Sequence, residues 1–245
     1  MARLHHMLRT VGPRPISLVI TSDQTSYNFF TSAGSPGSAV TATVQVASGI
    51  KVRAFTFGNF PAGSVLTLVN YGYLYGIGGT AGTGGDATTQ SSGTNGSAGQ
   101  DAVTLVSINV TIDNTYGYIY GGGGGGGGGG GLYIPTVFSG GGGGGGGGQG
   151  LGGGGGFGGP GLNGAGANGT DGSFNAAGLG GWAYGNHGFG GDGGGWGGNG
   201  HAGVTMDGNL GFGNGGAAGK AVNLNGNTVT WLGGNNSTQV KGTVS

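Results

Sequence analysis

The sequence predicts a mainly β and irregular fold with almost no α-helix, in which a small N-terminal all-β unit joins a packed bundle of polyglycine type II helices. Glycine fills 53 of the 99 positions from Gly121 to Gly219, β-branched alternating runs precede this region, and a strand-to-glycine unit recurs. The competing interpretation of the glycine region is a flexible linker, because glycine has no side chain to bury and loses the most backbone entropy on ordering.

The spacing of the glycines favours packing. Glycine recurs at every third position from Gly185 to Gly203, and the same step runs through residues 152–164 and 166–172. A polyglycine II helix has three residues per turn, so each in-phase row forms a bare edge against which another backbone can lie. N–H groups can then donate sideways to neighbouring carbonyl groups. Runs with glycine in all three rows, 121–131 and 140–148, are expected inside the bundle, and the other runs at its surface.

Composition alone favours a disordered linker over an ordered bundle. Two features of the glycine region favour order instead. Large aromatic residues are regularly placed in it, at Trp182, Phe189, Trp196 and Phe212, and charged residues, which would solubilise a linker, are scarce.

Taken in order, residues 1–15 are expected to form an N-terminal attachment arm. Leu4, Met7 and Leu8 lie at i, i+3 and i+4, which is typical of a short amphipathic helix, and Pro13 would end it. A peg that docks onto a larger assembly and a loosely held terminus are both compatible with this pattern.

Residues 16–75 are expected to form the β-rich unit. Its strand-like runs are separated by Gly, Pro, Ser and Asn, as strands separated by turns are. From Val40 to Val46, apolar residues alternate with Thr and Gln, which predicts one buried face and one wet face. This unit should cover one side or end of the glycine bundle.

A repeat connects the two parts of the chain. The segment 70–76, NYGYLYG, recurs as NTYGYIYG at 114–121, each time after an alternating strand and before glycine. The predicted glycine-helix bundle therefore covers residues 76–219 with a strand insertion at 101–120, and the tyrosines should stack in ladders across neighbouring strands. Residues 220–245 return to a strand pattern and are expected to close the fold by pairing with the N-terminal β unit.

These segments resemble the glycine-rich receptor-binding proteins of tailed bacteriophages, of which the T-even-type adhesin at the tip of the long tail fibre is the best-known form. The resemblance rests on the Asn-containing aromatic step that leads into polyglycine, and on glycine tracts interrupted by short aromatic segments. It implies a rigid polyglycine II sandwich whose loops recognise an outer-membrane protein or surface glycan of a bacterium. It also implies a place in the virion, at the distal tail or tail fibre, with the N-terminal arm on a phage tail or fibre protein.

Other function classes find little support. The chain has no glutamate, no cysteine, no Gly-x-Ser-x-Gly elbow and no lysine in its glycine runs, so we expect no enzyme, no cofactor and no metal site. Seven basic and seven acidic residues give no field for nucleic acid, and no apolar stretch is long enough to insert into a membrane. A glycine-rich structural scaffold is the main alternative. An ice-binding protein comes third, since bulky aromatics would disrupt a flat ice-binding face.

The turns between antiparallel glycine helices should alternate between the two ends of the bundle. Interruptions occur at 132–139, 160–165, 173–184 and 204–210, so the first and third are expected to share one end. Rigid aromatic side chains on a stiff scaffold are good anchors for a partner. The expected receptor-binding residues at that end are Tyr133, Ile134, Phe138, Phe174, Trp182 and Tyr184.

Overall fold

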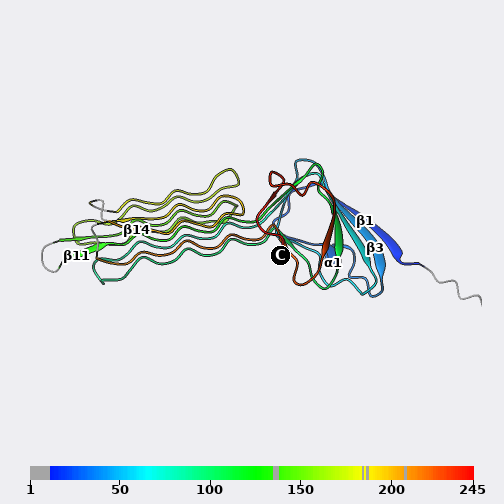
Figure 1. Cartoon of the computed structure of the whole chain (residues 1–245), viewed down its shortest axis with the longest axis horizontal. Coiled ribbons are helices and arrows are strands. Elements are labelled where there is room, and N and C mark those ends of the chain that lie inside the picture. The colour runs from blue at the N-terminus through cyan, green and yellow to red at the C-terminus, as the bar shows by residue number, and fades with distance from the viewer. Residues whose placement is uncertain (1–11, 135–137, 184, 186–187, 207–208) are drawn as a thin grey trace, which may run out of the picture.

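The computed structural model describes residues 12–134, 138–183, 185, 188–206 and 209–245, so most of the predicted arm at 1–15 lies outside the described residues. The chain has two parts, a β unit at one end and a long bundle of extended, undulating tracts at the other (Figure 1). The only α-helix among the described residues is α1 (Phe29–Ser32), a single turn inside the β unit.

Three sheets form the β unit, and every strand pairing within them is parallel. From β3 onward the chain passes through the first, second and third sheets and then returns to the first. It therefore forms a coil, and successive turns of this coil stack on each other. The strands are β1 (Arg14–Ile20), β3 (Val40–Val46), β6 (Val65–Asn70), β9 (Val110–Asp113) and β16 (Val229–Gly233) in the first sheet; β4 (Lys51–Arg53), β7 (Tyr73–Tyr75), β10 (Tyr118–Tyr120) and β17 (Val240–Lys241) in the second; and β2 (Tyr27–Asn28), β5 (Phe55–Thr56), β8 (Val103–Thr104) and β15 (Val222–Asn223) in the third.

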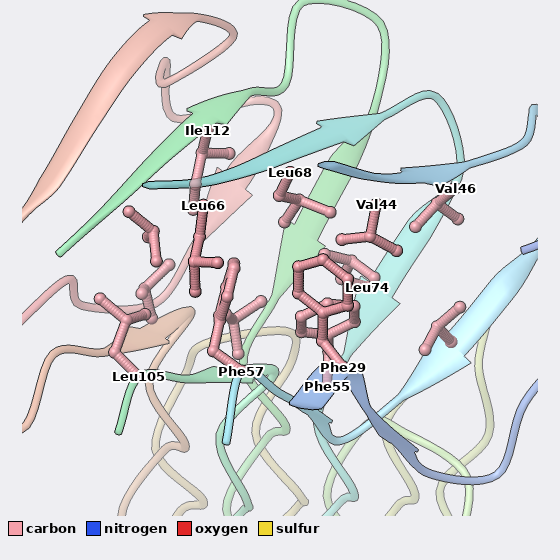
Figure 2. Packing of buried hydrophobic residues seen from close by; sticks show 14 of the residues in the cluster. Phe29, Val44, Val46, Phe55, Phe57, Leu66, Leu68, Leu74, Leu105 and Ile112 are labelled. Carbon is pink, nitrogen blue, oxygen red and sulfur yellow. The ribbon is translucent and has the colours of Figure 1, made fainter. Parts of the chain in front are cut away.

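The core lies inside this coil. Val44, Leu68 and Ile112 occupy the same register position on neighbouring strands of the first sheet, and all three are fully buried. They face Phe55 and other aromatic residues from the opposite side (Figure 2). The alternation predicted for residues 40–46 is confirmed, since the valines and Ala42 are buried while Thr41 is exposed. Stacked β-branched and leucine side chains therefore hold successive turns together.

Two buried asparagines link successive turns of the coil. Nδ2 of Asn70 donates to Oδ1 of Asn114 at 2.8 Å, and Nδ2 of Asn114 donates to the carbonyl oxygen of Gly234 at 2.7 Å. Both side chains are completely buried. Each turn thus satisfies the polar groups of the next, as buried polar groups require.

We expect Asn114→Ala to lower the free energy of unfolding by about 2–4 kcal/mol, because the Gly234 carbonyl oxygen and one Asn70 N–H would lose their partner inside the protein. Chemical denaturation measures this change. Asn175→Ala is the control, since Asn175 is exposed, and it should change stability by less than about 0.5 kcal/mol. Equal stability of the two variants would contradict a structural role for this pair of asparagines.

Ten glycine-rich tracts run side by side in the described part of the bundle, and backbone hydrogen bonds join each of them to its neighbours. Their hydrogen-bond partners place them in three layers. The layers are 92–100, 76–85 and 153–160; then 211–219, 121–131, 140–148 and 166–172; then 198–205, 188–194 and 178–183.

The two tracts with glycine at every position, 121–131 and 140–148, lie at the centre, and each is hydrogen-bonded to six other tracts. In 121–131 the donors step by three: Gly122 bonds to one neighbour, Gly123 to a second and Gly124 to a third, and the cycle then repeats. Carbonyl groups of the same tract accept from three further tracts. Every glycine from 121 to 131 and from 140 to 148 is buried. A backbone can be surrounded in this way only where no row carries a side chain.

Polar side chains replace the missing neighbour at the bundle's surface. Asn95, Asp171, Asp192 and Asn199 each accept, through Oδ1, a hydrogen bond from a backbone N–H of an adjacent tract, all at 2.8 Å. The donors are the N–H groups of Asn214, Gly155, Gly180 and Ala218, respectively. The polar residues between surface glycines therefore complete the backbone hydrogen bonding.

Two later segments take different places from those expected. The strands of 103–120 lie within the β unit, where β9 pairs with β6, and they are not inserted into the glycine bundle. Residues 220–245 do return to the β unit, but β15, β16 and β17 pair directly with β8, β9 and β10 rather than with strands of 16–75. The reason is that each turn of the coil pairs only with its neighbours, and the last turn stacks on the one before it.

Candidate functional site

The end of the bundle that points away from the β unit, called the distal end below, carries most of the turns between tracts. Strands β11 (Leu132–Ile134) and β14 (Val204–Thr205) mark it in Figure 1. The turns at 86–91 and 160–165 also lie there, since Ala87 donates its N–H to the Pro160 carbonyl oxygen. Several chain segments far apart in sequence therefore meet on one surface.

A short hairpin forms one part of this surface. β11 pairs antiparallel with β12 (Phe138–Gly140), which places Ile134 opposite Phe138 in the register. Asn209, from another loop, holds this hairpin: its Oδ1 accepts from the Tyr133 N–H at 2.8 Å, and its Nδ2 donates to the Tyr133 carbonyl oxygen at 2.6 Å. The amide side chain thus takes the place of a pairing strand. No local pattern in the sequence distinguishes Asn209 from other loop asparagines, so this role was not predicted.

A second part of the surface comes from three neighbouring tracts. Trp182 packs edge-on against Phe189 of β13 (Gly188–Phe189), with ring centroids 5.3 Å apart. Phe189 in turn pairs with Val204 of β14. Trp182 remains 66% exposed, and the loop that follows β14 leads to Asn209 and hence to the hairpin. The two parts of the surface are therefore connected.

The predicted site residues divide between the ends of the bundle. Tyr133, Ile134, Phe138 and Trp182 lie at the distal end, whereas Tyr184 lies outside the described residues. Phe174 lies at the opposite end, so the expectation that it joins the others is wrong. The cause is a turn within the glycine run near 149–152, where Gly150 and Gly152 have φ values of 123° and 105°. Glycine adopts such values readily, and only Gln149 and Leu151 interrupt the glycine run at this turn.

Phe174 belongs to an aromatic cluster where the bundle meets the β unit. It packs edge-on against Tyr73 and Tyr75 of β7 and against Trp196, with centroid distances of 5.3–5.5 Å. Gln149 connects two bundle turns here, since its Nε2 donates to the Phe174 carbonyl oxygen and its Oε1 accepts from the Trp196 N–H. Burial raises the pKa of the Tyr75 hydroxyl, and it raises that of Tyr120 to about 12. This cluster joins the two parts of the molecule.

The distal surface is almost uncharged, and several large apolar side chains are exposed on it. Five large apolar side chains at this end are each at least 45% exposed, namely those of Ile134, Leu162, Trp182, Val204 and Met206. Asp86 is the only charged residue in the described distal turns, and hydrogen bonds from Thr88 and Thr89 hold its pKa below the usual range. Among the described residues, no three His, Cys, Asp or Glu side chains are grouped to hold a metal ion. No helix in the described chain is long and apolar enough to cross a membrane. Such a surface suits binding to another macromolecule.

Comparison with known proteins gives two matches. Residues 15–245 match the family model described as phage tail fibre adhesin Gp38. The fold is similar to the crystal structure of the gp37-gp38 adhesin tip complex of the bacteriophage S16 long tail fibre, with a TM-score of 0.60 and 26% sequence identity. That match covers 95% of this chain and 82% of the other. No curated protein sequence matches the chain.

Proposed function

The chain belongs to the Gp38 family of phage tail fibre adhesins, and on this basis we propose that its distal end binds the receptor on the host cell. As an adhesin of the long-tail-fibre tip, the protein is part of the virion and lies at the distal end of the fibre. The receptor we propose is an outer-membrane protein or a surface glycan of the bacterium. Binding rather than catalysis is the proposed role of the whole chain.

The observation that carries this proposal is the exposed apolar surface around Trp182. An exposed apolar patch on a soluble protein commonly marks a binding surface, and tryptophan is among the residues that contribute most to binding energy. Trp182 is fixed by its contact with Phe189, and the tracts beneath it are held by hydrogen bonds on several sides. Little conformational entropy is then lost on binding.

The opposite end of the molecule is the proposed attachment point for the fibre. In the related S16 complex, gp38 is joined to gp37 in the adhesin tip. Among the described residues β1 pairs only with β3, so its other edge offers backbone N–H and carbonyl groups to a partner. The predicted N-terminal arm, residues 1–15, leads into this strand, which begins at Arg14. We therefore place the contact with a phage fibre protein at β1 and the arm.

We expect Trp182→Ala to reduce binding of the purified protein to host cells at least tenfold. The reason is that a central aromatic anchor commonly contributes about 2 kcal/mol or more to the binding free energy. Binding of fluorescently labelled protein to whole cells measures this. Leu232→Ala is a matched control, because Leu232 is also 66% exposed but lies on β16 of the β unit. Circular dichroism should report the same fold for both variants. Unchanged binding by a folded Trp182→Ala variant would contradict the proposed site.

A further inference from the structure

The outer face of the second sheet carries tyrosine and basic residues in two rows. Lys51, Tyr73 and Tyr118 lie side by side in the register of β4, β7 and β10. The second row continues as Arg53, Tyr75 and Tyr120, and Lys241 of β17 ends it. Val52, Leu74 and Ile119, which lie between these rows along the strands, are completely buried in the core, so the rows point outward.

The tyrosine rings on this face form a ladder. Tyr73 and Tyr118 stack with centroids 4.9 Å apart and planes 11° apart, and Tyr71 stacks on Tyr116 at 6.1 Å. Tyr116 lies at the end of its stack and is 72% exposed. A ring with one covered and one free face offers a rigid apolar platform.

Apart from that of Tyr120, which donates to the Thr238 carbonyl oxygen at 3.3 Å, the phenol hydroxyl groups on this face have no partner in the described protein. The hydroxyls of Tyr71, Tyr73, Tyr116 and Tyr118 make no hydrogen bond to another described residue, and neither does that of Tyr75, although Tyr75 is only 4% exposed. Tyr75 lies beneath Phe174 and Trp196, but the hydroxyls of Tyr71, Tyr73, Tyr116 and Tyr118 belong to exposed or half-buried residues and are available to a ligand that is itself rich in hydroxyl groups.

The charge of the face is positive. It carries Lys51, Arg53 and Lys241, three of the seven basic residues of the chain. The lysine ammonium groups lie over aromatic rings, with Nζ of Lys51 4.5 Å from the Phe174 centroid and Nζ of Lys241 5.0 Å from that of Tyr120. The carboxylate beside them is Asp23, whose Oδ1 accepts the Lys51 backbone N–H. An excess of positive charge over negative charge remains.

We propose that this tyrosine and lysine face binds a phosphorylated saccharide of the host envelope. Sugar C–H groups stack on free aromatic faces, sugar hydroxyls match the unpartnered phenols, and ammonium groups pair with phosphate. The inference rests on the proposed function in that the target is the host surface. It adds a second contact, on the β unit, at the other end of the bundle from the distal surface. A polymer that extends outward from the cell surface could then be held near the fibre while the distal end holds its receptor.

The test uses the full-length protein and a defined probe, the phosphorylated core oligosaccharide released from lipopolysaccharide by removal of its lipid. Calorimetry should detect binding by the wild-type protein. Tyr116→Ala should weaken it roughly tenfold through loss of the exposed platform, and Lys241→Gln should weaken it by a similar factor. The same oligosaccharide after enzymatic removal of phosphate should bind as weakly to the wild type as the intact one does to Lys241→Gln.

Trp182→Ala separates this inference from the proposed receptor site. It should bind the oligosaccharide like the wild type while losing binding to whole cells. If the wild-type protein does not bind the oligosaccharide, or if Tyr116→Ala and Lys241→Gln both bind it unchanged, the saccharide site is wrong, whatever Trp182→Ala does to cells. Since Tyr116 is 72% exposed and Lys241 is also exposed, both variants are expected to fold, which melting temperature checks.

Discussion

Gly126→Ala is expected to prevent folding of the bundle. A Cβ atom at this position would overlap the carbonyl oxygen of Gly191 on a neighbouring tract. Gly126 also donates to the Gly146 carbonyl oxygen and accepts from the Gly82 N–H, both at 2.8 Å, so its tract is held on several sides and cannot shift to make room. Close packing of this kind does not absorb an added methyl group. We expect a loss of more than about 4 kcal/mol, seen as little or no soluble folded protein.

A matched glycine provides the control. A Cβ atom at Gly154 would meet nothing within 4 Å, and Gly154 lies in a surface tract. Gly154→Ala should therefore leave stability unchanged or raise it by about 0.4–1 kcal/mol, because alanine restricts the unfolded chain. Soluble yield and thermal melting compare the two variants. A Gly126→Ala protein that melts at the temperature of Gly154→Ala would show that the central tract is not closely packed.

Deletion of residues 229–245 is expected to lower the melting temperature by roughly 10 °C or more, given that about 1 kcal/mol corresponds to 2–4 °C for a chain of this size. The deletion removes β16 and β17, and with them the pairing partners at one edge of β9 and β10. It also removes Gln239, whose Nε2 donates to the carbonyl oxygens of Asn114 and Thr115. The buried Asn114 would lose its partner at Gly234 as well.

Differential scanning calorimetry measures the effect of this deletion. Leu232→Ala is the control, since it keeps both strands and removes only an exposed side chain from β16. A truncated protein with the melting temperature of the full chain would mean that the last turn of the coil contributes nothing to stability.

The sequence predicted the centre of the bundle well because the physical requirement, a run of residues without Cβ atoms, can be read directly from the residue types. Only a run with no Cβ in any row can be surrounded on six sides, and 121–131 and 140–148 are such runs. The parallel coil of the β unit was not predictable in the same way. Several of its strands have two or three residues, and their partners lie far along the chain, 45 residues away for Tyr73 and Tyr118 and 119 residues away for Val103 and Val222. The repeated tyrosine segment marks β7 and β10 as neighbours, and Tyr73 and Tyr118 stack as expected. Elsewhere, local patterns carry no information about such distant pairing.

The candidate site was predicted in part. Tyr133, Ile134, Phe138 and Trp182 share the distal end because turns after 131 and 182 fall where side chains interrupt glycine. Phe174 lies at the other end because the chain turns near Gly150, where only Gln149 and Leu151 interrupt the glycine run. The contacts of Asn209 with Tyr133 span 76 residues and depend on the completed bundle.

The arrangement of tracts also determines how the molecule carries mechanical load. With the fibre proposed at β1 and the receptor at the distal surface, tension between virion and cell runs along the tracts. Their hydrogen bonds are directed across the tracts, from each backbone to its neighbours. Such a pull loads these bonds in shear and distributes the force over many of them at once, so that they would have to break together. A pull directed across the tracts would instead separate them from one end and break their hydrogen bonds one at a time.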